Sequence, residues 1–581
     1  LKGDGIPLTG TENQNESDDG RALMVRPGGL GQSLSERISL AFYKLTWRTP
    51  IHNSRLSGKL PLRLVATPED PLTANNARGK SLLMDKFLFQ GMEQNISTID
   101  YGKLLLPPSM IDYLHRFGWL RDLAATTNRG EGAPIAAAIA DGWLAGNTKK
   151  IREPAWSAEN CAWRLLNMAA AAPYILSSND PVYRSSILNH FARTARHLDR
   201  SAPRGGNRFQ RLCGWVGVVA ASLLLPEGKA RRVVGESGLH QSLGETIFED
   251  GGVISRSPMQ LIDIIGLLSL LRQCYSATSE PMPKFVTDAL NRAVPAMLGL
   301  THADGGLGAW QGSGHIGPEK IKDIVDASGV RARPHRQALD WGYQRVAASN
   351  SVLLLDAGPP PLAKQFSAGC ASTLAFEFSH GGQRLVVNCG GSGLVGASIP
   401  ATLARGLRTT AAHSTLCIDD TNSTAILPGG QLGRGVGEVG LDRRDIDKAT
   451  RIEASHNGYA RSFGFLHSRL LILRSDGLEL RGEDSLLPAP KAKPRDGVPC
   501  HIRFHIGPDI ELAVNDDGRA IVLRLPDGSA WLFAAGKGKA QIDDSIWVDD
   551  EGVPHPGQQI VVEALADKGG LSVGWQFRFL G

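Results

Sequence analysis

The sequence predicts a multidomain α + β protein in which an array of α-helices precedes an antiparallel β-sandwich. Residues 33–341 repeatedly place apolar side chains at positions i, i+3, i+4 and i+7, the spacing of amphipathic helices. Residues 342–581 instead alternate apolar and polar side chains or are rich in β-branched residues, with Asp-Gly and Gly-Gly turns between the segments. The change of period predicts two domains of different class. Residues 1–32 are polar, and we expect a flexible tail there.

Many successive helices with short links are expected in the first domain. Examples are the segments 108–125, 157–176, 181–200 and 257–275, with Pro, Gly, Ser or Asp at their junctions. Such a series predicts an array of α-hairpins. The spacing leaves open whether the array closes into a ring.

Composition narrows the function classes. The 581 residues carry a net charge of +5, which is compatible with an anionic partner. No Lys/Arg tract is present, so a nucleic-acid partner is not predicted. The seven cysteines form no C-x-x-C pair, which favours buried free thiols over a disulfide scaffold or a zinc site. We expect no membrane span and no signal peptide, because no apolar stretch has the required length or position.

Four segments have a family resemblance. Residues 372–390 read as strand–Gly-Gly–strand, and residues 408–420 place Arg408 and His413 in one turn. In the helical half, residues 248–258 read FEDGGVISRSP and residues 207–212 read NRFQRL. With the order of elements, these segments resemble the heparinase II/III family of polysaccharide lyases. The resemblance implies an incomplete (α/α) toroid, a β-sandwich, and a site in the cleft between them.

The resemblance also implies a chemistry, β-elimination across a uronic acid. Cations or donors neutralise the C6 carboxylate so that the developing enolate-like charge is stabilised. A Tyr or His takes the C5 proton, and another protonates the departing O4. The implied function is a lyase acting on a heparin-like, heparan-like or bacterial acidic polysaccharide, which is then the expected partner. No cofactor is expected.

Eight residues are candidates for this site. The implied catalytic or assisting residues are His413, Asn207, Arg208 and Gln260. The implied substrate contacts are Arg164, Arg256 and Arg408, and the Gly-rich segment 302–315 adds Trp310 as a side chain that could stack on a sugar.

Two departures from the family pattern favour an alternative function. Gln260 and Leu261 stand where the family has Tyr and His, and an amide cannot act as a base. Ala368, Cys370 and Ser372 stand where the family often has His-x-His-x-Asp, so a metal site is not expected. The alternative is a relative that binds acidic glycans without lyase chemistry. Replacement proton carriers are offered by Tyr275, His240 and Tyr459.

The candidates also have structural interpretations. Asn207 is a favoured N-cap residue, and Arg164 lies in an apolar helix where it needs an acceptor. A lone histidine such as His413 is commonly structural, Arg256 could be a solvated loop residue, and Trp310 could be buried. A glycoside hydrolase would need two carboxylates across the cleft. The available ones are Glu159, Glu245 and Asp250, which no spacing marks as a pair.

Two locations are compatible with the sequence. The family resemblance implies the cell envelope or periplasm. The free thiols and the expected lack of an export signal favour the cytoplasm.

Overall fold

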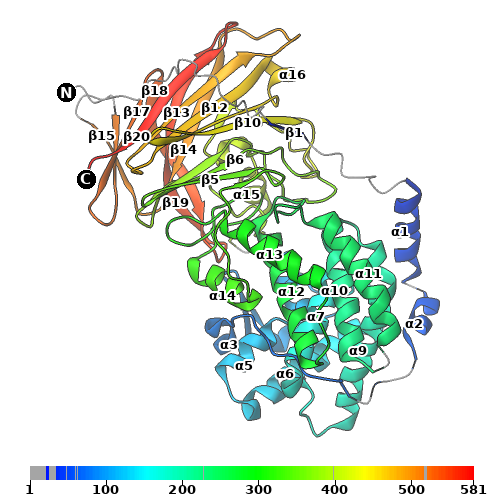
Figure 1. Cartoon of the computed structure of the whole chain (residues 1–581). Coiled ribbons are helices and arrows are strands. Elements are labelled where there is room, and N and C mark those ends of the chain that lie inside the picture. Colours follow the sequence, from blue (N-terminus) through cyan, green and yellow to red (C-terminus); the bar gives the residue numbers. More distant parts are fainter. Residues whose placement is uncertain are drawn as a thin grey trace.

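The computed structural model describes residues 21–24, 34–47, 49–58, 61, 63–226, 228–396, 398–515 and 520–581. A helical domain is followed by a domain of two large antiparallel sheets, and the two domains lie one above the other in Figure 1. The predicted fold class is therefore confirmed. The expected tail over residues 1–32 falls mostly outside the described residues. Within it, β1 (Arg21–Met24) pairs antiparallel with β10 (Glu438–Ile446).

The first domain consists of helices and one small hairpin. The hairpin joins β2 (Lys86–Phe89) to β3 (Met92–Asn95). The helices are α1 (Leu34–Thr46), α2 (Pro50–Leu56), α3 (Asn76–Leu83), α4 (Pro108–Arg116), α5 (Trp119–Thr126), α6 (Arg129–Asn147), α7 (Ala158–Ala170), α8 (Ala172–Ile175), α9 (Pro181–Ser201), α10 (Arg208–Leu224), α11 (Lys229–Thr246), α12 (Pro258–Ala277), α13 (Lys284–Leu298) and α14 (Pro318–Ser328).

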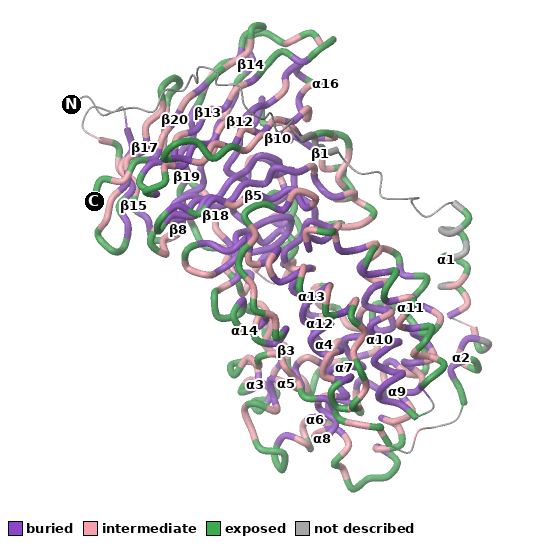
Figure 2. Tube along the Cα trace, in the orientation of Figure 1, coloured by how far each residue is buried: buried purple, intermediate pink, exposed green. Residues whose placement is uncertain are grey.

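Helix α10 is the centre of this domain. It packs against α7, α9, α11 and α12, and most of its side chains are buried (Figure 2). A helix that is apolar on every side is stable only when other helices surround it. Two glycines allow the close approach, because a Cβ at Gly214 would lie 2.8 Å from Ala202 Cα and one at Gly217 would lie 2.8 Å from Leu198 Cδ1. None of the described helices has both the length and the hydropathy to cross a membrane.

Two sheets form the second domain. One has the order β1-β10-β11-β12-β13-β20-β17-β16-β15, and the other has the order β18-β19-β14-β8-β7-β6-β5-β4, with β9 also paired to β14. Beyond β1 and β10, the strands are β4 (Gln337–Ala338), β5 (Tyr343–Ala348), β6 (Ser351–Asp356), β7 (Phe376–His380), β8 (Gln383–Val387), β9 (Leu416–Ile418), β11 (Ala449–His456), β12 (Phe465–Arg474), β13 (Glu479–Pro488), β14 (Val498–Ile506), β15 (Glu511–Val514), β16 (Ala520–Arg524), β17 (Ala530–Ala535), β18 (Lys539–Val548), β19 (Pro554–Ala566) and β20 (Leu571–Phe579).

The predicted strand–Gly-Gly–strand segment is β7 and β8. Gly381 and Gly382 have φ angles of +55° and +87°, which favour glycine in this tight turn. The core between the sheets is aromatic: Phe376 stacks on Trp575 with ring centroids 5.4 Å apart, and Phe504 packs edge-on against Trp575 at 4.8 Å.

Buried polar contacts fasten the two domains together. They connect the loop after α13 and the segment before α12 to strands of the sandwich. The pairs are Arg256 with Asp356 (2.8 Å), His302 with Glu377 (2.7 Å) and Arg384 with Asp304 (2.8 Å). Because these pairs are largely excluded from water, they fix the orientation of the loop 302–315 against the sandwich. Helix α14 is the last helix before β4, the first strand of the sandwich after the helical domain.

Candidate functional site

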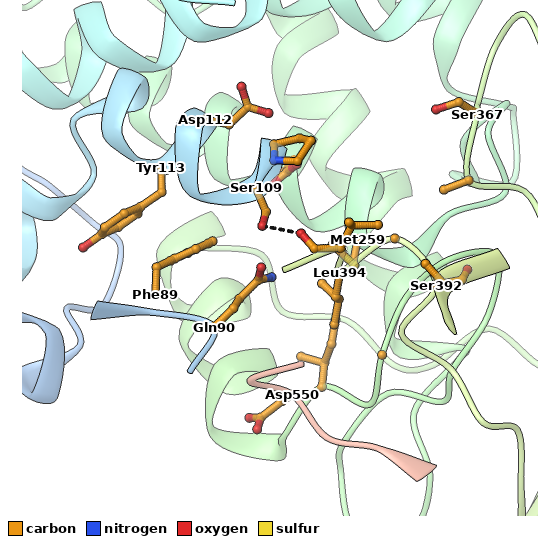
Figure 3. A pocket seen from close by; sticks show the side chains of 18 of the residues that line it. Phe89, Gln90, Ser109, Asp112, Tyr113, Met259, Ser367, Ser392, Leu394 and Asp550 are labelled. Atoms are coloured by element: carbon orange, nitrogen blue, oxygen red, sulfur yellow. Dashed lines mark hydrogen bonds between the residues drawn. The ribbon is translucent and has the colours of Figure 1, made fainter. Parts of the chain in front are cut away.

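A cavity of about 820 Å³ lies between the helical domain and the sandwich. Its helical wall comes from α3, α4, α5, α7, α12, α14 and the end of β2. Its sandwich wall comes from loops around residues 367–368, 392–395 and 428–430 and from helix α15 (Ala401–Gly406). Figure 3 shows Ser109 on α4 directed toward the loop that carries Leu394, whereas Asp112 projects from α4 away from that loop. Ser109 Oγ donates to the Val395 carbonyl at 2.9 Å, so the two walls touch here.

The arginines of the helical wall are already paired with carboxylates. Each forms an ion pair with an acidic residue inside or beside the cavity: Arg78 with Glu551 (3.2 Å), Arg121 with Asp70 (2.8 Å), and Arg116 with Glu159. Arg121 also donates to Asn167 at 2.9 Å. These cations are therefore largely neutralised within the protein.

The arginines of the sandwich wall are not paired. Arg408 is 7% exposed, and its Nε donates to the Gly369 carbonyl at 2.8 Å while Nη1 donates to the Gly430 carbonyl. Its Nη2 has no hydrogen-bond partner, and among the described residues no carboxylate forms an ion pair with Arg408 or Arg405. Burial and then the charge of Arg405 lower the pKa of Arg408, although a guanidinium stays protonated at neutral pH. These two residues form what we call the arginine pair.

Aromatic side chains line the cavity beside these charges. Phe89 and Tyr113 stack with their ring centroids 4.4 Å apart, and the Arg78 guanidinium lies 4.8 Å from the Phe89 ring. Trp163 also lines the cavity and is almost fully buried. An apolar wall with a few fixed polar groups is the usual composition of a ligand pocket.

Carboxylates gather on the helical wall in a group that we call the acidic cluster: Asp112, Asp263 and Glu159. Burial raises the pKa of Glu159 to about 7 despite its ion pair with Arg116. Burial also raises the pKa of Asp263. Burial lowers the pKa of Arg116, whereas the charges of the three carboxylates raise it. The effect of the carboxylates is larger in sum, so the pKa of Arg116 is raised and this residue is a cation within the cluster.

The proton carriers that line the cavity are His315 and Tyr113. Burial and then Arg384 lower the pKa of His315 to about 4, so the imidazole is neutral at pH 7. The Tyr113 hydroxyl lies 3.2 Å from Asp122 Oδ2 and donates to it, and burial raises the tyrosine pKa. A tyrosine held in this way is a poor base, because its phenolate is disfavoured. The imidazole remains able to accept a proton.

Of the eight candidates from the sequence, Arg408 lines the cavity. Arg164 lies in the interior of the helical domain, where its Nε donates to His190 at 3.0 Å and its guanidinium carbon lies 4.4 Å from the Trp143 ring. Asn207 Oδ1 caps α10 by accepting from Gln210 N at 2.8 Å. The observed contacts therefore match the structural interpretations of these residues, with Asn207 as an N-cap and Arg164 as a buried arginine bonded to an acceptor.

The remaining candidates lie away from the cavity lining. Arg208 Nη1 donates to the Glu245 carbonyl at 3.0 Å, and Arg256 is held by Asp356. His413 is buried, with Nδ1 2.7 Å from the Thr409 carbonyl. Gln260 lies in the first turn of α12, beside the cavity-lining Met259, and Trp310 packs against Tyr343 in the core. The structure thus does not bring these eight side chains together.

The other carboxylates and proton carriers named from the sequence also have internal partners. Asp250 Oδ2 accepts from the backbone N–H groups of Asp340 and Trp341, and Glu245 pairs with Arg211 at 3.6 Å. The alternative proton carriers contact groups outside the cavity lining: Tyr275 with Glu236, Tyr459 with the Leu416 carbonyl, and His240 with the Phe285 ring. Among the residues that the structure describes, no group of His, Cys, Asp and Glu is arranged to hold a metal ion.

Sequence reasoning missed Arg405, Arg116, Asp112 and Asp263, and it named Glu159 of the acidic cluster only as an available carboxylate for a hydrolase. Arg405 stands three residues before Arg408 in ATLARGLR, and this spacing was a signal that both side chains could serve one site. Arg116 and Asp112 lie in an amphipathic helix whose polar side chains resemble an ordinary solvated face. The Gly-rich segment 302–315 does reach the cavity, through Gly314 and His315 rather than through Trp310.

Comparisons with known proteins agree with this architecture. Residues 330–576 match the family model "Heparinase II/III-like, C-terminal". The chain is 26% identical over 541 residues to "FtsZ-localized protein C" of Caulobacter vibrioides (strain NA1000 / CB15N), covering 90% of this chain and 92% of that protein.

Two solved structures show the same fold over nearly the whole chain. One is heparinase III, with a TM-score of 0.70 and 12% identity, covering 96% of this chain and 93% of that one. The other is the heparan sulfate lyase HepC from Pedobacter heparinus, with a TM-score of 0.56 and 14% identity, covering 94% and 88%. At these identities the likeness establishes the fold, an α-helical toroid with a β-sandwich.

Proposed function

The C-terminal domain matches the heparinase II/III-like family model over residues 330–576, and we propose that the chain is a member of that family that binds an acidic polysaccharide in the cavity between toroid and sandwich. The observation that carries the proposal is the arginine pair. Arg408 is buried, lines the cavity and leaves Nη2 without a partner, and among the described residues neither Arg408 nor Arg405 has a carboxylate partner. A buried cation is stable only when a countercharge or enough acceptors surround it, and a ligand carboxylate supplies both.

The aromatic wall supports a sugar ligand. Phe89 and Tyr113 offer an apolar surface next to the guanidinium of Arg78. The ring of a uronic acid has an apolar face and a carboxylate edge. Such a ligand fits a cavity that combines aromatic rings with unpaired arginines.

Binding is better supported than elimination. The position of the family tyrosine is Gln260, which is not among the cavity-lining residues. Tyr113 is tied to Asp122, and burial lowers the pKa of His315 to about 4, so its imidazole is a weak base at neutral pH. Elimination would need a base, an acid and a neutralised carboxylate on one sugar.

A glycan panel tests the proposal. Purified protein is titrated with heparosan, hyaluronan, alginate and a neutral dextran, and ultraviolet absorbance is followed for the unsaturated product of elimination. We expect affinity for uronate polymers, none for dextran, and no new absorbance. Arg408→Ala should lose the binding, whereas Arg444→Ala, which removes an exposed arginine of the same domain, should not.

The outcomes separate the alternatives. Equal binding by Arg408→Ala and the starting protein would overturn the cavity as the glycan site. New absorbance that disappears in His315→Gln would establish lyase chemistry with the imidazole as base. Reducing ends without absorbance would instead indicate hydrolysis.

A second proposal concerns location. The relative that matches almost end to end is named for localisation to FtsZ, and we propose that this chain also localises to FtsZ assemblies. This agrees with the cytoplasmic alternative and with seven buried free cysteines. Fluorescent fusions imaged with labelled FtsZ test it, and a diffuse or peripheral signal that does not follow FtsZ would refute it.

A further inference from the structure

We propose, building on the proposed function, that the polysaccharide carries free amines as well as carboxylates. Its ammonium group would lie against the acidic cluster while its carboxylate binds the arginine pair. The ligand class is then a uronate polymer whose hexosamine is not N-acetylated. The proposal rests on two sets of charged groups that form no ion pair among the described residues, the Asp263 carboxylate on the helical wall and the arginine pair on the sandwich wall.

The sandwich wall carries positive charge without a counter-ion. Arg405 and Arg408 bond to backbone carbonyls of the loops at residues 369 and 428–430, and no carboxylate among the described residues pairs with them. Backbone carbonyls orient the guanidinium groups but cannot cancel their charge. This wall therefore selects an anionic group.

The acidic cluster has one carboxylate more than the cations that act on it. Asp112, Asp263 and Glu159 all influence Arg116, and this arginine is committed to Glu159 and to Asn160 (3.1 Å). Arg116 and Lys320 are therefore the two cations that act on these three carboxylates. Lys320 also lines the cavity and lies near Asp263, but its ammonium group forms no ion pair among the described residues.

Asp263 is the member of the cluster that is open to a ligand. It lines the cavity from α12, and no hydrogen bond or ion pair reaches its carboxylate from the described residues, whereas Asp112 accepts from Asn160 Nδ2 at 2.7 Å. Burial raises its pKa, so a nearby ligand cation would relieve an existing cost of ionisation.

Trp163 supplies an independent sign that the helical wall holds a polar ligand. The residue is 8% exposed, lines the cavity, and its Nε1 has no hydrogen-bond partner. The Arg116 guanidinium lies 5.9 Å from the same ring. Buried indole N–H groups usually find an acceptor, and a sugar hydroxyl beside the amine would provide one.

The proposal predicts a preference opposite to that of a simple basic surface. A purely basic site binds the more negative polymer better, in the order N-sulfated, N-acetylated, free amine. The acidic cluster should reverse this order, because a sulfate is repelled and an acetyl group leaves the carboxylates uncompensated, whereas an ammonium group pairs with them.

One glucuronate–glucosamine polymer tests this in three forms. Heparosan, de-N-acetylated heparosan and N-sulfated heparosan are titrated into the full-length protein. We expect about tenfold tighter binding of the free-amine form than of the N-acetylated form, which corresponds to about 1.4 kcal/mol. Asp263→Asn, which keeps the side-chain shape, should abolish that difference while retaining affinity for the N-acetylated form. Asp288→Asn, on the same domain but paired with Lys284 at the surface, is the matched control and should keep the difference.

The failures of the two proposals are distinguishable. If no form binds, the proposed function fails, and this inference fails with it. If all forms bind equally, or the N-sulfated form binds best, the amine site is refuted while the glycan-binding function stands. A preference that survives in Asp263→Asn would also refute the assignment to the acidic cluster.

Discussion

The core of the toroid and the sandwich wall of the cavity each contain a buried arginine, and the two arginines have different surroundings. In the toroid, all three guanidinium nitrogens of Arg164 have partners: His190, the carbonyls of residues 115 and 155, and the sulfur of Cys161. In the sandwich wall, Arg408 has two bonded nitrogens and one without a partner. Neither arginine forms an ion pair with a carboxylate among the described residues.

The comparison gives the reason why we propose Arg408, and not Arg164, as the ligand-binding arginine. Arg164 lies on the rings of Trp143 and Trp156, which shield its charge inside the domain. Arg408 lines a cavity, so its missing contact can be made by a ligand. Burial alone does not distinguish the two. The two arginines are distinguished by the number of guanidinium nitrogens that have a hydrogen-bond partner and by access to a cavity.

The largest expected effect is on stability, in Arg164→Ala. The substitution removes the guanidinium from its place against two indoles and takes its N–H donors away from His190 and from the carbonyls of residues 115 and 155. We therefore expect the free energy of unfolding to fall by about 3–5 kcal/mol. Urea unfolding followed by helical circular dichroism measures this. Arg408→Ala is the comparison and should lose about 1 kcal/mol. Equal losses would contradict the distinction between the two arginines.

The second prediction concerns pH and the core beside Arg164. Burial lowers the pKa of His197 from 6.5 to about 3, so the folded protein holds this imidazole neutral. The unfolded chain binds the proton first, and therefore the contribution of His197 is present above pH 6.5 and is lost as the pH falls toward 3. Between pH 7 and pH 5 the loss should be about 2 kcal/mol.

His197→Gln provides the measurement for this pH effect. The amide can still donate to the Trp156 carbonyl that His197 contacts at 2.8 Å, but it does not titrate. The stability gap between the variant and the starting protein should narrow by about 2 kcal/mol when urea midpoints are compared at pH 7 and pH 5. A gap that does not change with pH would show that His197 is not the titrating group.

The third prediction sharpens the function of Arg408. Arg408→Lys keeps the charge but cannot bond to the carbonyls of residues 369 and 430 and to a ligand carboxylate at the same time. We expect the affinity for heparosan to fall about tenfold, or about 1.4 kcal/mol, by calorimetric titration. Full affinity in the lysine variant would mean that charge alone, without the planar geometry of the guanidinium, accounts for binding.

The smallest effect is expected at the exposed member of the arginine pair. Arg405 is open to solvent, so Arg405→Ala should weaken glycan binding only a few-fold, by about 0.5–1 kcal/mol, and leave the unfolding free energy unchanged within about 0.5 kcal/mol. The loss should shrink as salt rises from low to high ionic strength, because exposed charges are screened. If the loss of affinity did not depend on salt, Arg405 would contact the glycan directly, shielded from solvent, and would not be an exposed charge.

Much of the fold could be predicted from local pattern, because helix and strand periods are properties of neighbouring residues. The helical array, the β2–β3 hairpin and the β7–β8 turn at Gly381 and Gly382 all follow from spacing that the chain displays directly. The residues of the candidate site were predicted less well from the sequence than the fold was. Arg408 was found through a motif, whereas Asn207 and Arg164 satisfied motif positions while serving as a helix cap and a core residue.

The sequence by itself determined the class of each domain, the order in which they occur and the kinds of charged group available. Tertiary structure decided which of those charges remain open to a ligand. That choice depends on partners far away in the chain: Glu551 neutralises Arg78 and Asp356 holds Arg256, while no carboxylate among the described residues reaches Arg408. Pairing acts across space over a few ångströms, and the distance along the chain gives no measure of it.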